Sequence, residues 1–417
     1  MAPRGRCRFI LVLLELLASA PAVPTAARAE PVRLDTSFEL KTLWAVFHDY
    51  GEMPLFPGTL SIPSQQARWM VDLQKDWFSA EAHLVFSLAT WNTDNQVFQL
   101  TGTDLVVTRV TETLPLQAEL ADVPGQAGGN HIESRLRFDR LWLRSSTRHF
   151  DLTLGRQPLS FGTAVIYQII DRIVPLPPFS IDREYKPGVD AIRADVHLAP
   201  ATDLALVYAF GGDASAHNAR IAAALRGPVG AGEGLLFASV LHDMPLFGLG
   251  YEVDLGSWIL RGEGSVVAES NAEATAPAFA MATLGFEHAF SFGLNLVGEL
   301  NYFGFGVTDP KDYPKVLYHP RILSGDLPFF FGSFFAGTIA SYSFLSWLDA
   351  STLISVSLLD GSVYLYPTIT CSLPRAQFLL SSIIPLGARG QHPYQPNNEL
   401  DLSPPGVLME LRVFFGR

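Results

Sequence analysis

The stretch VRLDTSFELKTLWAV, residues 32–46, alternates apolar side chains with charged or polar ones along most of its length. Its even positions begin with Val32 and Leu34, and its odd positions begin with Arg33 and Asp35. Successive side chains of a β-strand point to opposite faces, so the stretch predicts a strand with one apolar and one charged face. It exceeds the roughly 5–6 residues of a soluble strand. It also meets the about 9–11 residues that a tilted strand needs to cross a membrane.

The same pattern recurs and predicts about eighteen strands, an even number as in bacterial barrels; sixteen strands remain an alternative. The predicted strands are 32–46, 65–77, 78–91, 131–143, 149–157, 189–198, 202–210, 218–226, 235–242, 247–256, 257–268, 278–289, 290–303, 333–345, 347–359, 362–373, 376–385 and 407–415. Connections after odd-numbered strands include the long ones, which are 47–64, 92–130, 158–188, 304–332 and 386–406. The others are mostly short turns. This alternation is typical of a barrel with periplasmic turns and extracellular loops.

The composition agrees with an all-β transmembrane antiparallel up-and-down β-barrel better than with a soluble sandwich. Of the 417 residues, 48% are hydrophobic and only 17% charged, whereas soluble domains carry roughly 25% charged residues. One charge-free stretch, Leu327–Trp347, is long enough for a membrane helix, but Pro328, Gly332 and Gly337 interrupt it. Aromatic residues near strand ends predict lipid-facing girdles. They are Trp44, Trp69, Trp77, Trp142, Trp258, Tyr302 and Trp347.

The first residues predict a cleaved secretory signal at 1–29, followed by the barrel with its inserted extracellular loops at 30–417. Arg4, Arg6 and Arg8 precede a short apolar run, and Ala27-Arg28-Ala29 has small residues where a signal peptidase cleaves. Only Cys371 then remains, which excludes an intrachain disulfide.

Several function classes are disfavoured. The net charge of −12 opposes nucleic-acid binding, which needs a basic surface. The Gly-x-Ser-x-Gly, His-Glu-x-x-His, P-loop and EF-hand motifs are absent from the sequence. We therefore predict no enzyme, metal or cofactor. An outer-membrane hydrolase is kept as a remote alternative, because the members of a catalytic triad meet only in space.

A barrel of this size has a lumen that side chains alone do not fill, so loops must narrow it. The best candidate is 158–188, which carries Asp171, Arg172, Asp182, Arg183, Glu184 and Lys186. The polar strand faces add Arg33, Asp35, Glu39, Lys41, Arg135, Arg137, Arg193 and Asp195. These charges either tune the pore or pair with one another and hold the loop in place. The aromatic loop 304–332 is a second candidate for a lid.

The segment Leu154-Gly155-Arg156-Gln157-Pro158-Leu159-Ser160-Phe161-Gly162, the stretch 188–193 (GVDAIR) and Asp360-Gly361-Ser362 resemble porin-like and alginate-export-like outer-membrane families. The resemblance implies a diffusion or export channel with Arg156 and Gln157 facing the pore at the top of a strand. Arg156 shares the parity of apolar residues, so a bulge or a position beyond the membrane must turn it inward.

These patterns predict a porin-type channel for passive or facilitated diffusion of small polar or charged solutes, such as saccharides or anions. The alternative is a non-transporting structural or adhesive barrel with partner-binding loops. The expected partners are outer-membrane lipid, small polar solutes and the insertion machinery, which the alternating last strand 407–415 would engage. A homo-oligomer is left open.

Overall fold

The computed structural model describes residues 32–48, 59–91, 119–127, 130–173, 186–211, 219–241, 244–268, 278–317, 319, 322, 327–328, 330–387 and 396–416. The predicted signal peptide lies outside these residues, and so do the loop charges Asp182, Arg183 and Glu184. The unit described below is Arg33–Arg417.

The described residues form nineteen strands in one antiparallel sheet, with very little helix. The strands are β1 (Arg33–His48), β2 (Thr59–Lys75), β3 (Phe78–Trp91), β4 (Glu119–Ala127), β5 (Asn130–Ser146), β6 (Phe150–Gln157), β7 (Val189–Ala199), β8 (Thr202–Ala209), β9 (Arg220–Val229), β10 (Gly232–Leu241), β11 (Met244–Leu255), β12 (Trp258–Ala268), β13 (Ala278–Ala289), β14 (Leu294–Phe303), β15 (Phe334–Leu345), β16 (Leu348–Ser357), β17 (Val363–Leu373), β18 (Ala376–Leu386) and β19 (Gly406–Phe415). A 3₁₀ turn, η3 (Pro310–Asp312), leads into the short helix α2 (Tyr313–Leu317). Among the residues described, no helix is both long and apolar enough to span a membrane.

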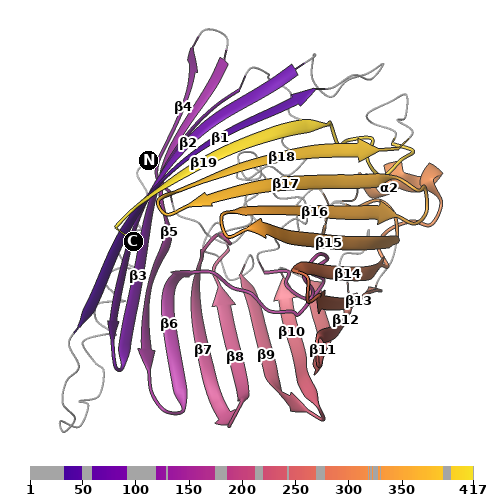
Figure 1. Ribbon diagram of the computed structural model, residues 1–417. Helices are drawn as coiled ribbons and strands as arrows, with labels where there is room; N and C mark the ends of the chain where they lie inside the picture. The colour runs from indigo at the N-terminus through magenta and orange to yellow at the C-terminus, as the bar shows by residue number, and fades with distance from the viewer. Residues whose placement is uncertain are drawn as a thin grey trace, which may run out of the picture. The chain divides into compact units, whose positions relative to one another are not determined.

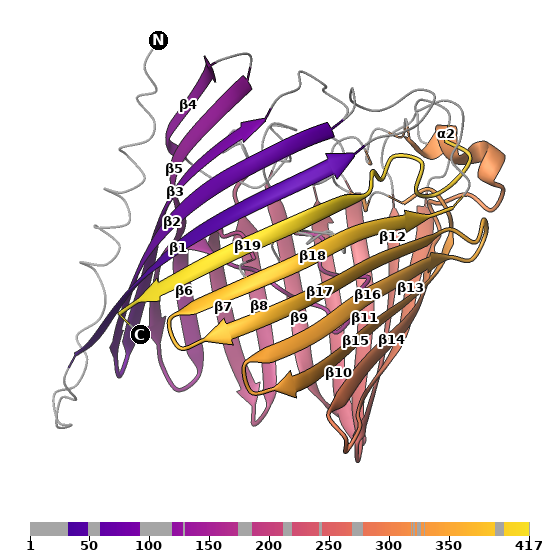
Figure 2. The same cartoon turned by 45° about the horizontal axis from the view of Figure 1, so that its top comes forward.

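The sheet closes on itself because β1 pairs with β2 on one side and with β19 on the other. Phe38 stands opposite Trp69 of β2 and Phe415 of β19. Figures 1 and 2 show indigo β1 beside yellow β19. Strand β4 lies outside this ring, since β3 pairs directly with β5. The described wall therefore has eighteen strands, which confirms the predicted number and leaves no open edge to face lipid.

The two faces of the wall follow the alternation that the sequence predicts. On β1, Leu34 and Trp44 are 60% and 50% exposed on the outer face, whereas Glu39 and Lys41 of the inner face are 2% and 7% exposed. Exposed apolar side chains continue around the outer face on the other strands. The exposed apolar side chains of the described wall therefore form an outward-facing apolar surface, as in a barrel that crosses a membrane.

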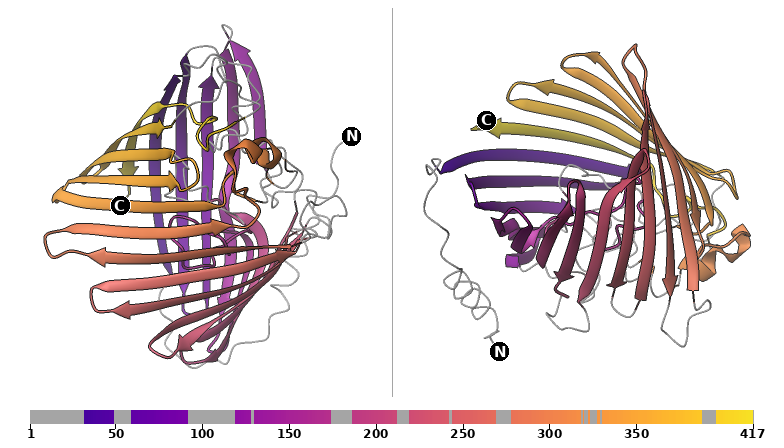
Figure 3. Two further views of the ribbon diagram at one scale, coloured as in Figure 1. Left: turned by 90° about the vertical axis from the view of Figure 1, so that its right-hand side faces the viewer. Right: turned by 90° about the horizontal axis from the view of Figure 1, so that it is seen from below.

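The two ends of the barrel differ as predicted. At the turn end, most described strand pairs are joined by two or three residues, as between β7 and β8 or between β15 and β16. At the loop end, the connections include the long stretches that follow β6 and β14. Figure 3 shows the short turns of the later strands on the side away from α2. Leu327–Trp347, the one stretch long enough for a membrane helix, instead contains strand β15.

One predicted girdle residue is placed wrongly by the alternation. Strand β5 has a bulge at Asp139, where His83 and Leu84 of β3 pair with Arg140 and Phe138. A bulge adds one residue and reverses the alternation beyond it. Trp142 consequently faces the lumen, where its indole N–H donates to Glu81 Oε2 at 3.0 Å.

Candidate functional site: a segment across the lumen

The residues that follow β6 enter the lumen instead of leaving the barrel. The lumen segment, Pro158–Ile173, has no strand or helix, and most of its side chains are buried. Figure 1 shows this segment in magenta, running from the top of β6 toward β14 and β15. The structure thus places the described part of the predicted loop 158–188 inside the barrel.

Two wall glutamates bind the backbone of the lumen segment. Glu263 of β12 accepts hydrogen bonds from the N–H groups of Thr163 and, at 2.8 Å, of Ala164. Glu299 of β14 accepts three more, from Val165 at 2.6 Å, Ile166 at 3.0 Å and Tyr167 at 2.9 Å. A buried backbone without a strand partner needs other acceptors for its N–H groups. The two carboxylates supply them.

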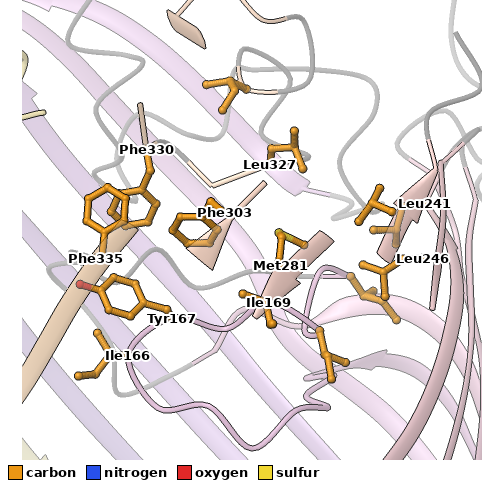
Figure 4. Close-up of a cluster of buried hydrophobic side chains, with 14 of the residues drawn as sticks. Ile166, Tyr167, Ile169, Leu241, Leu246, Met281, Phe303, Leu327, Phe330 and Phe335 are labelled. Atoms are coloured by element: carbon orange, nitrogen blue, oxygen red, sulfur yellow. The ribbon is translucent and has the colours of Figure 1, made fainter. Parts of the chain in front are cut away.

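Tyr167 anchors the middle of the lumen segment to the wall. Its hydroxyl lies 2.6 Å from Ser355 Oγ of β16. Its ring meets Phe303 edge-on and also contacts Phe330 and Phe335, at centroid distances of 6.3, 5.8 and 6.1 Å. Figure 4 shows Tyr167 among these phenylalanines, with Ile166 next to it. This half of the lumen is therefore filled by an apolar core.

Glycine on the wall makes room for this core. A Cβ atom at Gly337 of β15 would lie 2.7 Å from Tyr167 Cε2 and 3.1 Å from two carbons of Ile166. A Cβ atom at Gly248 of β11 would lie 3.0 Å from Ile170 Cγ1. Any larger residue at these two positions would push the segment away from the wall.

The charges of the lumen segment hold its ends. Asp171 Oδ2 accepts hydrogen bonds from Ser160 Oγ at 2.8 Å and from Lys186 Nζ at 2.5 Å. Burial lowers the pKa of Lys186, although Asp171 favours its charged form. Arg220 of β9 donates to the carbonyl oxygens of Arg172 at 3.0 Å and Ile173 at 2.6 Å. Asp171 and Lys186, which the sequence singles out as pore candidates, thus form a structural ion pair.

The opposite side of the ring carries a row of arginines on β2 and β5, half a ring away from β12 and β14. Arg68 forms an ion pair with Asp139 at 2.5 Å, and its guanidinium also lies 3.3 Å from His83 Nδ1. Arg140 pairs with Glu81 at 3.2 Å. Asp139 shares the parity of the inward-facing Glu133 and Arg135, and the bulge brings the next residue, Arg140, inward as well.

Two further arginines of β5 differ from these. Arg137, in the loop-end half, and Arg144, in the turn-end half, form no ion pair with any other residue that the structure describes. Arg144 Nε donates instead to the hydroxyl of Thr153 at 2.9 Å. Both lie on inward positions, so this wall carries positive charge that its carboxylates do not balance.

The other predicted pore residues are mostly paired along the wall. Lys41 lies 3.3 Å from Glu410, Arg193 lies 2.8 Å from Asp195, and Arg135 pairs with Glu133. Arg33 and Asp35 form an exposed pair at 2.7 Å near the start of β1. Glu39 is buried on the inner face. Whether these residues tune the pore remains a prediction.

Arg156 lies at the point where the β5–β6 ladder ends. Its guanidinium forms two hydrogen bonds of 2.8 Å to Asp190 and donates at 2.7 Å to the carbonyl of Phe138. The last β5–β6 pair is Leu141 with Arg156, so the carbonyl of Phe138 has no β6 partner. Gly155 before it takes a φ of +113°, which favours glycine. Arg156 is buried and secures this seam of the wall.

Asp360, Gly361 and Ser362 form a turn at the loop end. Asp360 accepts hydrogen bonds from the Ser362 N–H at 2.9 Å and the Tyr313 hydroxyl at 3.0 Å. It also accepts from the N–H of Glu399 at 2.7 Å. The sequence resemblance includes Asp360. Glu399 lies far along the chain, and no motif or pattern in the sequence predicts its contact with Asp360.

One group of side chains has spacing suited to a metal. Ligand atoms of Asp72, Glu81 and His83 lie within 4.8 Å of one another. However, His83 Nδ1 faces an Arg68 N–H, and a histidine that binds metal through Nε2 normally donates from Nδ1. His83 Nε2 already lies 2.8 Å from Glu81. The group is therefore best described as an ion-pair network.

Glu263 and Glu299 are the residues that the sequence reasoning missed as site residues. Each is a carboxylate on an inward strand position with glycine beside it, as in Gly262-Glu263-Gly264 and Gly298-Glu299. That combination is a usable signal, since a lone buried charge in a barrel wall needs a partner from inside.

No family model and no curated protein matches the chain. Solved structures do match. OccAB4 of Acinetobacter baumannii aligns with a TM-score of 0.57 at 10% identity, covering 92% of this chain and 98% of that one. OccK7 (OpdD) of Pseudomonas aeruginosa aligns with a TM-score of 0.52 at 9% identity, covering 91% and 99%. A BenF-like porin of Pseudomonas fluorescens Pf-5 aligns with a TM-score of 0.51 at 10% identity, covering 92% and 99%.

At such identities the likeness concerns the fold. It supports the porin-like part of the resemblance, while the alginate-export-like part gains no support from these structures. The described residues form a closed antiparallel β-barrel with eighteen strands in its wall, and this is the fold of these porins.

Proposed function

We propose that this chain is a diffusion channel of the outer membrane for small polar or charged solutes, and that anions pass it more readily than cations. The observation that carries the proposal is the lumen segment, which is bound to Glu263 and Glu299 and lies across the barrel from the arginines of β2 and β5. A pore narrowed in this way admits small solutes only.

The charge of the wall supports the preference for anions. Arg137 and Arg144 have no ion-pair partner among the residues described, whereas Glu263 and Glu299 are occupied by backbone N–H groups. An unbalanced positive charge beside a narrow aqueous path attracts anions and repels cations. The likeness in fold to porins supports a channel over the hydrolase alternative.

The test is conductance of the purified full chain in a planar bilayer. We expect stepwise openings and, in a salt gradient, a reversal potential on the anion side. A barrel that inserts without conducting would overturn the channel and favour the structural or adhesive alternative. A reversal potential on the cation side would overturn the anion preference alone.

A double variant tests whether the lumen segment is the constriction. In Glu263→Gln with Glu299→Gln, the backbone N–H groups lose charged acceptors, at about 2 kcal/mol for each charge-assisted bond. We expect a larger single-channel conductance, because the segment moves away from its wall. Glu233→Gln, at an exposed carboxylate of β10, is the matched control and should leave conductance unchanged. An unchanged conductance in the double variant would place the constriction elsewhere.

A further inference from the structure

Two neighbouring turns at the turn end of the barrel carry exposed aromatic side chains. Phe292, in the turn between β13 and β14, is 61% exposed, and Trp347, in the turn between β15 and β16, is 44% exposed. Phe344, near the end of β15, is 59% exposed. Turns that meet water are usually built from small and polar residues, so these large rings need another explanation.

The rings around the first turn are in contact with one another. Trp258, at the start of β12, stacks on His288 of β13 at a centroid distance of 4.1 Å. His288 Nδ1 donates at 3.0 Å to the carbonyl oxygen of Ser257, and its ring meets Phe290 edge-on at 4.3 Å. Phe290 in turn lies 5.3 Å from Phe292. The row of rings therefore extends from the wall into the turn itself.

The second turn continues this row. A Cβ atom at Gly293 would lie 3.5 Å from Tyr342 Cε2 of β15, so the first turn lies against the ring of Tyr342. Tyr342 meets Phe344 edge-on at 4.8 Å. We call these side chains the aromatic rim, which consists of Trp258, His288, Phe290, Phe292, Tyr342, Phe344 and Trp347.

The aromatic rim is continuous with the apolar outer face of the wall. Its strands β12, β13, β14 and β15 are neighbours in the sheet, as Figure 1 shows. His288 and Phe290 extend the outward row of β13 that includes Leu284, which is 68% exposed. The stretches 288–298 and 340–348 contain no Asp, Glu, Lys or Arg. An apolar surface thus reaches past the ends of these strands.

The opposite side of the turn end has different chemistry. The turn between β5 and β6 lies half a ring away from β14, and its residues Thr147, Arg148 and His149 are all exposed. The Thr147 hydroxyl donates to the carbonyl oxygen of Phe150 at 2.8 Å and accepts from the Phe150 N–H at 3.1 Å. This turn is polar and charged, as expected for a turn in water.

Lipid is the partner that fits the aromatic rim. Tryptophan and tyrosine combine a flat apolar body with a polar edge, and they gather where a membrane meets water. The outer face that the rim extends is also the surface that lipid covers in a barrel of this kind.

We propose that the aromatic rim is a lipid-binding surface. It places the β13–β14 and β15–β16 turns among the headgroups and upper acyl chains of the turn-end leaflet, while the β5–β6 turn stays in water. The barrel is then seated unevenly in the membrane. Because β12 and β14 carry Glu263 and Glu299, lipid would hold the same part of the wall that binds the lumen segment.

Nitroxide spin labels on single cysteines test this proposal in the full chain, reconstituted in phosphatidylethanolamine–phosphatidylglycerol liposomes. With Cys7 and Cys371 replaced by serine, the labels are placed through Ser291→Cys and Ser346→Cys, one in each turn of the rim. Arg148→Cys, in the opposite turn, is the matched control. Oxygen concentrates in lipid and a nickel chelate stays in water, so we expect a severalfold higher ratio of oxygen to nickel collisions at 291 and 346 than at 148.

Two other outcomes would overturn the lipid-binding surface. Labels at 291 and 346 that meet the nickel chelate as freely as the label at 148 would place both turns in water. Labels shielded from both reagents would mean that a second copy of the chain covers the rim instead of lipid.

A double variant tests whether the rings themselves set the depth of the turns. In Phe292→Ser with Phe344→Ser, nickel collisions of the label at 346 should rise severalfold, with folding of the barrel checked by heat-modifiable migration on gels. An unchanged label in a folded barrel would contradict the proposal. None of these measurements requires conductance, so they test the rim independently of the proposed channel.

Discussion

Single carboxylate side chains in this barrel accept backbone hydrogen bonds of the kind that neighbouring strands accept in the wall. Glu263, Glu299 and Glu399 each accept hydrogen bonds from two or three backbone N–H groups. A hydrogen bond to a charged group contributes about 1.5–3 kcal/mol, and an unsatisfied buried N–H costs a similar amount. This explains how a segment without secondary structure can remain ordered inside a barrel.

At the same scale, Arg137 is the residue at which to test ion preference. Arg137→Ala should move the reversal potential toward cations, with the anion-to-cation permeability ratio falling about two- to fivefold, as expected for one unit charge near a solute in water. Arg137 has no ion pair with another described residue, so replacing it leaves no described carboxylate without an ion-pair partner. Arg137→Lys keeps the charge and should retain the preference. An equal shift in both variants would mean that the charge is not what matters.

Among the elements, strand irregularities decide which side chains reach the lumen. The alternation predicts every wall strand, but it assumes that each strand is regular. The bulge at Asp139 reverses the faces of β5 and turns Trp142 inward. The end of the β5–β6 ladder lets Arg156 reach the carbonyl of Phe138. The bulge has no signature in hydrophobic periodicity, whereas the parity of Arg156 with its apolar neighbours already indicates an irregularity at that position.

A pair of glycine variants tests how the wall seats the lumen segment. Gly337→Val should displace Tyr167 and Ile166, at a cost of about 1–3 kcal/mol for overpacking, and raise conductance. Gly264→Val is the control, since a Cβ atom there meets nothing within 4 Å. It should leave conductance unchanged. The same conductance in both variants would show that Gly337 does not support the constriction.

For the barrel as a whole, β4 is a strand without a place in the ring. Trp91 of β3 already stands opposite His131 of β5, so these two strands need only a hairpin turn of about two to five residues. Replacing residues 92–130 by such a turn should leave a folded barrel. The measurement is heat-modifiable migration on gels. Loss of the folded band would mean that β4 is part of the wall.

The sequence by itself determined the barrel. Side-chain alternation is a local property of a strand, so the number of wall strands, their faces and the two unlike ends could all be predicted from short windows. It also singled out 158–188 as the loop to narrow the lumen.

Only the tertiary structure decided the partners. Glu263 and Glu299 meet a segment more than ninety residues earlier in the chain, and Glu399 meets Phe331 although four wall strands separate them in the chain. The contacts of Glu263 and Glu299 form because the sheet closes into a ring around the lumen segment. Local sequence patterns do not show how the sheet closes. The alternation could therefore place charged residues on the inner face, but it could not show which residues they bind.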